Sequence, residues 1–406
     1  MRNGLLFMLM CLSAISCGLS EVGRTLSKKA GGSIWGDAPG NSGGAGNNIV
    51  PVCYMTAVDY PKGYDWRADA AKETVKCSLV VYTDGTPVMK VPVSEAYNVC
   101  SDPDMHRIVD GHLYTDYHFS GETMIKKDGT FLFSYAGEER ISDMKVRNGD
   151  VFTLGESCSG AGFSFRKNGK TKMLRENGSL MSPLRSYGDS IGFAFYEEIS
   201  SAAGNQLRYY SVYGTEVSQI ALRDDLVRVW DAVQDGNGVV YLASLIGVSQ
   251  PVIISGEKMM ALEMPVGAAM MSCSMFMAGD EIGVEGIYRS SQGIRYSAVW
   301  ISGECLVTFS GLTISALCTD GDGVFCALNP PDASSAGRIY RSGELYEMPR
   351  GYACIGSQSL DVVGGIMYVG LSSLDGGKPL LWKDGQIDSL RINGYISSVV
   401  CEDAGL

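Results

Sequence analysis

The chain has 406 residues, of which 45% are hydrophobic, and it contains 51 glycines. Its 33 Lys and Arg residues are outnumbered by 45 Asp and Glu residues, giving a formal net charge of −12 at pH 7. Nucleic-acid binding needs a concentrated basic surface, and no basic cluster stands out, so we expect no nucleic-acid partner.

The chain begins with a segment typical of export. Arg2 precedes an apolar stretch, residues 4–15, that is too short to span a membrane as a mature helix. The following AISC, Ala14 to Cys17, resembles the lipobox of bacterial lipoproteins, although Leu is commonest where Ala14 stands. The resemblance implies that residues 1–17 are a signal peptide and that cleavage leaves Cys17 lipidated. An ordinary secretory signal is the alternative, and either one exports the chain.

Residues 18–48 are rich in Gly, Ser and Asn and cannot bury a core. We interpret them as a flexible tether of roughly 30 Å root-mean-square length. The remaining residues, 49–406, form the globular domain.

A hairpin signal repeats along this domain. Short apolar strands run into turns that contain Gly85, Gly129, Gly169, Gly214, Gly256, Gly303, Gly343 and Gly385, spaced 40 to 47 residues apart. A second turn recurs between these hairpins, so each period holds four antiparallel strands, A to D. Four strands in about 42 residues predict a β-propeller blade, because stacking blades around an axis buries both faces of each sheet. We therefore predict an all-β, eight-bladed propeller, with seven blades as the alternative.

The two ends of the domain predict how the ring closes. Residues 396–406 match a strand A, whereas residues 48–58 begin a blade that has no strand A before them. We expect the C-terminal strand to join the N-terminal blade. Cys401 then aligns with Cys318, and Cys53 with Cys326, which makes Cys53–Cys401 and Cys318–Cys326 candidate disulfides in an exported protein.

The last repeat, Trp382-Lys383-Asp384-Gly385, resembles exported β-propeller lipoproteins of Gram-negative bacteria that carry W-K-(N/D)-G repeats, a kelch- and WD40-like architecture. The resemblance covers residues 50–406 and is loose in blades two to four. It implies an exported propeller, usually without assigned chemistry, and it transfers no functional residue.

Catalytic and metal motifs are weak. GDSIG (188–192) matches a nucleophile elbow, but it lies at a predicted hairpin turn and no histidine follows residue 118. Neither DGNG (235–238) nor DGDG (320–323) has the Glu that an EF-hand loop requires. We expect no cofactor and no metal, and an enzyme is the less favoured class.

Two groups of residues are candidates for binding. In HLYTDYHF, strand alternation places His112, Asp116 and His118 on one face, which suits proton transfer or a metal but equally suits hydrogen-bonded packing between blades. Tyr60, Tyr64 and Trp66 lie in a loop that does not repeat elsewhere, where they either bind a sugar or peptide or fold onto their own blade.

The sequence therefore favours an outer-membrane lipoprotein, at the cell surface or facing the periplasm, that binds a glycan, peptide or protein. It would contact the membrane through its lipid anchor only. A propeller hydrolase or lyase acting on polysaccharide is one alternative, and a structural subunit of an uptake or adhesion assembly is another.

Overall fold

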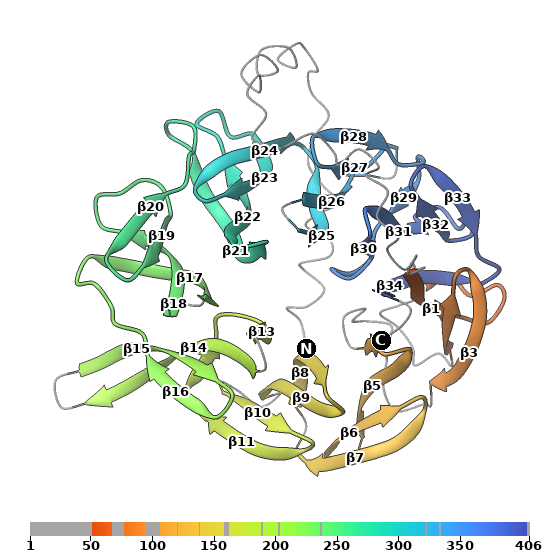
Figure 1. The fold of residues 1–406 in the computed structure, drawn as a ribbon, viewed down its shortest axis with the longest axis horizontal. Helices are drawn as coiled ribbons and strands as arrows, with labels where there is room; N and C mark the ends of the chain where they lie inside the picture. Colours follow the sequence, from red (N-terminus) through yellow and green to blue (C-terminus); the bar gives the residue numbers. More distant parts are fainter. Residues whose placement is uncertain are drawn as a thin grey trace, which may run out of the picture. The chain divides into compact units, whose positions relative to one another are not determined.

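The computed structural model describes residues 51–66, 77–93, 106–119, 121–137, 139–157, 162–187, 190–201, 204–235, 238–321, 323–332 and 334–403. The predicted signal peptide (1–17) with Cys17 and the predicted tether (18–48) lie outside these residues. The described strands form eight antiparallel sheets arranged as blades around an axis, which confirms the predicted eight-bladed propeller (Figure 1).

Each blade runs from an innermost strand A to an outermost strand D. Blade 1 contains β34 (Gly394–Asp403), β1 (Pro51–Asp59), β2 (Cys77–Thr83) and β3 (Thr86–Val93). Blade 2 contains β4 (His106–Val109), β5 (His112–Phe119), β6 (Glu122–Lys127) and β7 (Thr130–Ala136). Blade 3 contains β8 (Glu139–Arg147), β9 (Asp150–Ser157), β10 (Phe163–Lys167) and β11 (Lys170–Arg175). Blade 4 contains β12 (Gly178–Leu180), β13 (Arg185–Tyr187), β14 (Ser190–Ser201), β15 (Gly204–Tyr213) and β16 (Glu216–Gln219).

The other four blades follow in chain order. Blade 5 contains β17 (Leu226–Asp235), β18 (Gly238–Leu245), β19 (Val252–Ser255) and β20 (Lys258–Ala261). Blade 6 contains β21 (Ala269–Ala278), β22 (Glu281–Arg289), β23 (Arg295–Ile301) and β24 (Glu304–Ser310). Blade 7 contains β25 (Thr313–Asp320), β26 (Gly323–Asn329), β27 (Arg338–Arg341) and β28 (Glu344–Glu347). Blade 8 contains β29 (Tyr352–Ala353), β30 (Leu360–Val363), β31 (Ile366–Ser373), β32 (Leu380–Lys383) and β33 (Gln386–Ser389).

Strand A is interrupted in two blades. In blade 4, β12 and β13 both pair with β14, and Pro183 lies between them. In blade 8, β29 and β30 both pair with β31, and Gly356 between them has a φ of 92°. A proline cannot donate to the sheet, and a residue at such a φ leaves the extended conformation, so each break has a local cause.

The hydrophobic core is divided among the blade interfaces. The described apolar side chains form eight clusters, and each cluster joins residues of two neighbouring blades. The repeated aromatic of strand C belongs to these clusters: Trp300 is fully buried and Trp382 is 3% exposed. Burial of both sheet faces, which predicted the propeller from the sequence, is therefore how the molecule is stabilised.

In blades 1, 2, 3 and 8, an Asx-Gly pair forms the turn between strands C and D. Asp84 and Gly85 have φ values of 47° and 78°, the left-handed pair that a tight hairpin turn requires. The Asp84 Oδ1 atom accepts a hydrogen bond from the Cys53 backbone N–H at 3.1 Å, and the Asp84 N–H donates to the Cys53 carbonyl at 2.9 Å. In the same way, Oδ1 atoms accept hydrogen bonds from backbone N–H groups of strand B in three other blades: Asp128 from Leu113, Asn168 from Val151 and Asp384 from Met367. The Asx side chain thus ties the turn to strand B, which explains why Asx recurs before Gly.

The predicted ring closure is confirmed. β34 is hydrogen-bonded to β1, so the last strand of the chain completes the blade formed by the first three, and Figure 1 shows these two strands side by side. The two backbones approach closely at Gly394, where an added Cβ would meet the Val58 carbonyl oxygen at 1.8 Å. Only glycine can therefore begin β34 at this position without displacing β1.

Neither predicted disulfide is formed, and of the two cysteine pairs only Cys53 and Cys401 lie close together. Cys53, Cys318, Cys326 and Cys401 all carry free thiols. Cys53 and Cys401 belong to one cluster, and a hydrogen bond with the Cys53 thiol, followed by burial, raises the pKa of Cys401, so the predicted proximity is correct. Cys326 pairs with Leu317 rather than Cys318. Because neighbouring residues of a strand face opposite sides, Cys318 and Cys326 lie on opposite faces of the sheet.

Replacing Asp84 with Ala should destabilise the protein by about 1–2 kcal/mol, because the bond to Cys53 is lost and Ala is strained at positive φ. Asp84→Asn is the matched control, since Asn keeps an acceptor oxygen and tolerates this conformation. Urea unfolding measures both variants. Equal stability of the Ala and Asn variants would show that the side-chain bond does not hold the turn.

Candidate functional site

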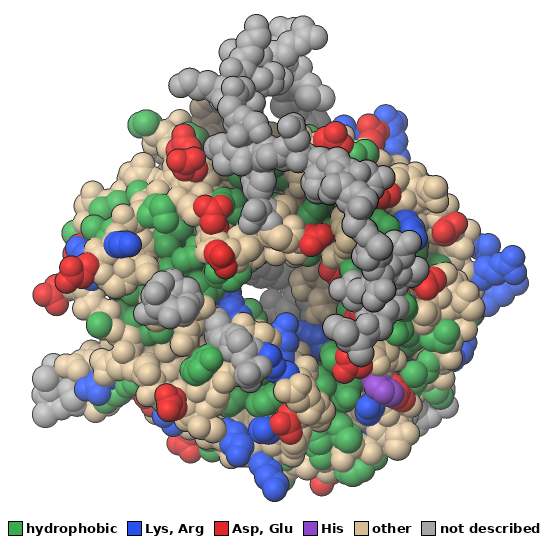
Figure 2. Space-filling model, viewed as in Figure 1, with side chains coloured by type: hydrophobic (Ala, Val, Ile, Leu, Met, Phe, Trp, Pro, Cys, Tyr) green, Lys and Arg blue, Asp and Glu red, His purple; other side chains and the backbone are tan. Residues whose placement is uncertain are grey.

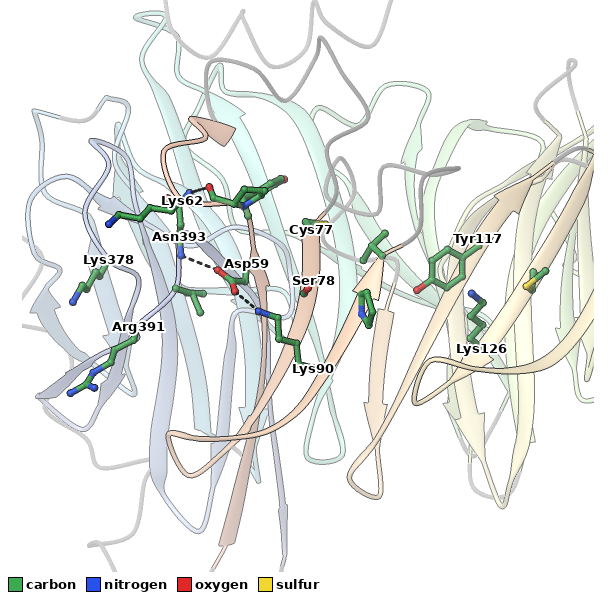
Figure 3. Close-up of a pocket in the computed structure, with 16 residues that line it drawn as sticks. Asp59, Lys62, Cys77, Ser78, Lys90, Tyr117, Lys126, Lys378, Arg391 and Asn393 are labelled. Atoms are coloured by element: carbon green, nitrogen blue, oxygen red, sulfur yellow. Dashed lines mark hydrogen bonds and ion pairs between the residues drawn. The ribbon is translucent and has the colours of Figure 1, made fainter.

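A groove of about 1190 Å³ spans blades 8, 1 and 2 (Figure 3). It lies where strands B and C are connected and where blade 8 leads into β34. The groove is lined by Asp59, Tyr60, Pro61, Lys62, Cys77, Ser78, Lys90, Pro92, Val93, Tyr117, Met124, Lys126, Lys378, Arg391, Ile392 and Asn393. Five cationic side chains therefore accompany one carboxylate in a protein whose overall charge is negative.

The cations fall into two groups. The Lys90 Nζ atom lies 3.0 Å from Asp59 Oδ2, and the Lys126 Nζ atom lies 4.4 Å from the centre of the Tyr117 ring. Lys62, Lys378 and Arg391 are exposed and form no ion pair with any described residue. These three charges are available to a ligand.

Segments from both ends of the domain hold the groove together. The Tyr60 N–H donates to the Asn393 carbonyl at 2.8 Å, and the Asn393 side-chain amide donates to the carbonyls of Pro61 and Tyr64. The Asn393 N–H also donates to Asp59 Oδ1 at 3.2 Å, one of the bonds drawn in Figure 3. Asn393 is thus the residue that fastens the loop after β1 to the segment before β34.

The three candidate aromatics pack together on blade 1. Tyr60 is 6% exposed and belongs to the core cluster between blades 1 and 2, against which the partly buried Tyr64 and Trp66 also pack. The ring centres of Tyr60 and Tyr64 are 5.0 Å apart, and those of Trp66 and Tyr395 are 4.9 Å apart. Of the three, Tyr60 lines the groove. Their role in binding stays a prediction.

No described contact joins the three candidate residues of β5, His112, Asp116 and His118, into one site. His112 is exposed, and its Nδ1 atom lies 2.7 Å from Asp128 Oδ2 in the C–D turn of its own blade. Asp116 is fully buried, and by alternation it shares the face of Tyr114, which packs against blade 3. His118 belongs to the same strand. A binding role for these residues stays a prediction.

A buried histidine contact escaped the sequence analysis. The His106 Nε2 atom lies 2.8 Å from Ser397 Oγ, and both residues are fully buried between blades 2 and 1. Burial, with the nearby charge of Arg107, lowers the pKa of His106 to about 3, so the imidazole is neutral at physiological pH. Because no substrate can reach this pair, it does not form a nucleophile and base; it joins the closing strand to blade 2.

The inner strands enclose a second hollow of about 500 Å³, and Figure 2 shows the ring open at its centre with Lys and Arg side chains in the opening. Its lining includes Arg107, Asp143, Lys145, Gln358 and Asp361 among mostly apolar residues. A pair of free carboxyl groups in this hollow would favour a polysaccharide hydrolase, because glycoside hydrolysis uses two such groups.

The carboxylates of the inner strands are instead used to join blades. We call Asp143, Asp231 and Asp361 the inter-blade aspartates. In each, Oδ1 accepts a bond from the next residue's N–H and Oδ2 accepts one from the following blade, at Leu184, Met275 and Cys401 respectively, over 2.7–2.9 Å. With all their oxygens engaged, Asp143 and Asp361 are poorly placed to act as a catalytic acid and base. The detectable signal was a single Asp inside an otherwise apolar strand A, as in VWDAV.

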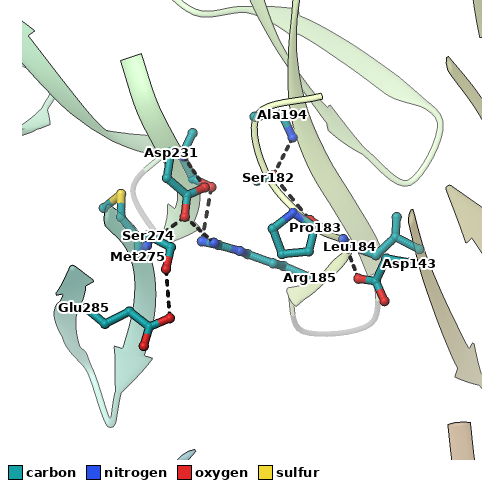
Figure 4. A network of polar contacts seen from close by, with 11 residues as sticks. Asp143, Ser182, Pro183, Leu184, Arg185, Ala194, Asp231, Ser274, Met275 and Glu285 are labelled. Atoms are coloured by element: carbon teal, nitrogen blue, oxygen red, sulfur yellow. Dashed lines mark hydrogen bonds and ion pairs between the residues drawn. The ribbon is translucent and has the colours of Figure 1, made fainter. Parts of the chain in front are cut away.

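Arginines from preceding blades strengthen two of these contacts. Arg107 lies 2.7 Å from Asp143. Arg185 lies 2.6 Å from Asp231, a contact drawn in Figure 4. Burial nevertheless raises the pKa of Asp231. Glu285 accepts a bond from the Ser274 hydroxyl at 2.9 Å in the same network, and burial, with the charge of Asp231, raises its pKa.

Neither a metal centre nor a membrane span emerges from the part of the chain that is described. No group of three or more His, Cys, Asp or Glu side chains within it could hold a metal ion. No helix within it is long and apolar enough to cross a membrane.

Comparison with known proteins gives no family. No family model matches the chain, and no curated protein matches it. Among solved structures, the β-propeller domain of the Trilobed protease from Pyrococcus furiosus is 12% identical, with a TM-score of 0.41, over 78% of this chain and 88% of that chain. The Pyrococcus horikoshii acylaminoacyl peptidase is 11% identical, with a TM-score of 0.44, over 82% of this chain and 56% of that one, so the chain spans about half its length.

Replacing Glu285 with Gln should stabilise the protein at neutral pH. A pKa raised by folding means that the carboxyl contributes stability when protonated, below its unfolded pKa, and loses that contribution as pH rises through its folded pKa. Gln mimics the protonated form and can still accept from Ser274. We expect the melting temperature to rise by roughly 1–2 °C at pH 7.5 and the gain to shrink at pH 4. A lower melting temperature at both pH values would contradict the assignment.

Proposed function

We propose that the protein is an exported, lipid-anchored propeller that binds a ligand in the groove spanning blades 8, 1 and 2 without chemically changing it. The observation that carries this proposal is the groove itself, with its apolar lining and three cations that form no ion pair with a described residue. The lipobox resemblance at 14–17 supports export and anchoring through Cys17, and it agrees with a domain that displays a binding surface at the membrane.

The alternatives are less well supported. A polysaccharide hydrolase needs a carboxyl pair free to exchange protons, whereas Asp143 and Asp361 in the central opening accept bonds that join the blades. A structural subunit of an uptake or adhesion assembly remains the main competitor. It predicts contacts with assembly partners rather than capture of an isolated ligand.

The test is capture of ligands from glycan and peptide arrays by the full chain, compared with two variants. Ser78→Trp places an indole in the groove, and Ser218→Trp places one on the exposed outer strand of blade 4. We expect Ser78→Trp to lose the captured ligands and Ser218→Trp to keep them. Retention by Ser78→Trp would overturn the groove as the site, turnover of a ligand would overturn the non-enzymatic function, and no capture would favour the structural subunit.

Fractionation of cells that express the protein tests its proposed location. We expect the wild-type protein to fractionate with the outer membrane and to incorporate labelled fatty acid, and Cys17→Ser to lose the label. Recovery of unlabelled wild-type protein in the cytoplasm would contradict export and lipidation.

A further inference from the structure

One side of the groove is a concentrated cationic surface. Lys62 follows β1, Lys378 belongs to the loop before β32, and Arg391 belongs to the segment before β34, and Figure 3 shows all three on the same side of the groove. The groove's one carboxylate, Asp59, is engaged by Lys90 and by the Asn393 N–H. An anionic group is therefore the natural counterpart of this side, which we call the cationic side.

The floor of the groove has a different character. Pro61 and Ile392 adjoin Lys62 and Arg391 in the chain and supply apolar surface beside the cationic side. Pro92 and Val93 of β3 and Met124 of β6 continue the apolar lining toward blade 2. A ligand that satisfies both parts must carry anionic and apolar groups close together. This requirement narrows the ligand to an amphipathic anion.

The geometry disfavours two such ligands. A sugar chain is usually bound by stacking on an exposed aromatic face, but the rings that line the groove, Tyr60 and Tyr117, are 6% and 4% exposed. An acyl chain gains most of its affinity from complete burial, whereas this groove is open to solvent along its surface. In an extended peptide, side chains alternate between two sides, so one side can meet cations while the other meets the floor.

We propose that the groove binds an extended peptide segment of a partner protein in which acidic and apolar side chains alternate. The acidic side chains pair with Lys62, Lys378 and Arg391, and the apolar side chains cover Pro92, Met124 and Ile392. This proposal rests on the proposed function and names the ligand class for the same groove.

The expected contribution of the three charges to the affinity sets the change in affinity that an experiment must detect. Three exposed contacts between carboxylates and Lys or Arg together change an affinity by about 3- to 100-fold. Salt screens such contacts, so the affinity should decrease as the NaCl concentration is raised from about 50 to about 500 mM.

The probe is a fluorescein-labelled peptide of about twelve residues, roughly 40 Å long when extended, in which Glu alternates with Leu. Its comparator replaces every Glu with Gln. Fluorescence anisotropy compares the full chain with Lys62→Ser/Lys378→Ser/Arg391→Ser and with a matched control, Lys170→Ser/Lys172→Ser/Lys258→Ser, whose three lysines are exposed on the outer strands of blades 3 and 5. Both triple variants lower the net charge by the same amount from −12.

We expect the acidic peptide to bind, the Gln peptide to bind about tenfold more weakly, and the cationic-side variant to lose about 3- to 100-fold while the control stays within about twofold. Equal binding of the two peptides, or an equal loss in the control, would overturn the proposal. So would failure of the acidic peptide to bind.

Two further probes separate this proposal from the function on which it rests. If oligogalacturonate or dodecyl phosphate binds in place of the acidic peptide, and Ser78→Trp abolishes that binding, the groove is still the ligand site but its ligand is a glycan or a lipid. If Ser78→Trp leaves such binding unchanged, both the ligand class and the proposed function are wrong.

Discussion

The pairing of β34 with β1 is the constraint on which the rest of the molecule depends. A blade buries both of its faces only when it has a neighbour on each side, so an open ring would expose two apolar faces at once. Closure by a strand from the far end of the chain removes that exposure. The close approach of Gly394 to Val58, the His106–Ser397 contact and the Asp361–Cys401 bond all lie along this strand and tie it to the blades on both sides.

The groove is a consequence of the same closure. Part of its lining comes from the start of the domain, at Asp59 to Lys62, and part from its end, at Arg391 to Asn393, and Asn393 donates hydrogen bonds to Asp59 and Pro61. Lys62 and Arg391 are brought to one side of the groove only because the two ends of the chain share a blade. Any change that loosens the closing strand should therefore weaken ligand binding as well as stability.

The fold was readable from the sequence because each blade repeats the same local chemistry. The turn glycine recurs in every blade, preceded by Asx in blades 1, 2, 3 and 8, and in most blades an aromatic before the turn packs at a blade interface. These features therefore recur at a regular period. The residues of the groove carry no such signal. Lys62, Lys90, Lys378 and Arg391 are ordinary surface residues in the sequence, and only the closed ring places them together.

The errors in the sequence reading have equally local causes. The predicted Cys318–Cys326 disulfide assumed a direct cross-strand pair, and a register offset of one residue put the two thiols on opposite faces. The site predicted at His112, Asp116 and His118 stays a prediction; His112 lies beside a turn and Asp116 between two blades. The inter-blade aspartates were overlooked because a lone Asp in an apolar strand acquires its role only from the backbone of the next blade.

Native-state hydrogen exchange of β34 and β1 tests the central claim most directly. If these strands close the ring, their amides should be protected to within about tenfold of those in β22 and β23, because all of them open only when the ring unfolds as a whole. Exchange in β34 that is faster by about a hundredfold or more, while β22 and β23 stay protected, would show that the C-terminal strand detaches on its own. The ring would then be stable without it, and the closure would not be what holds the molecule together.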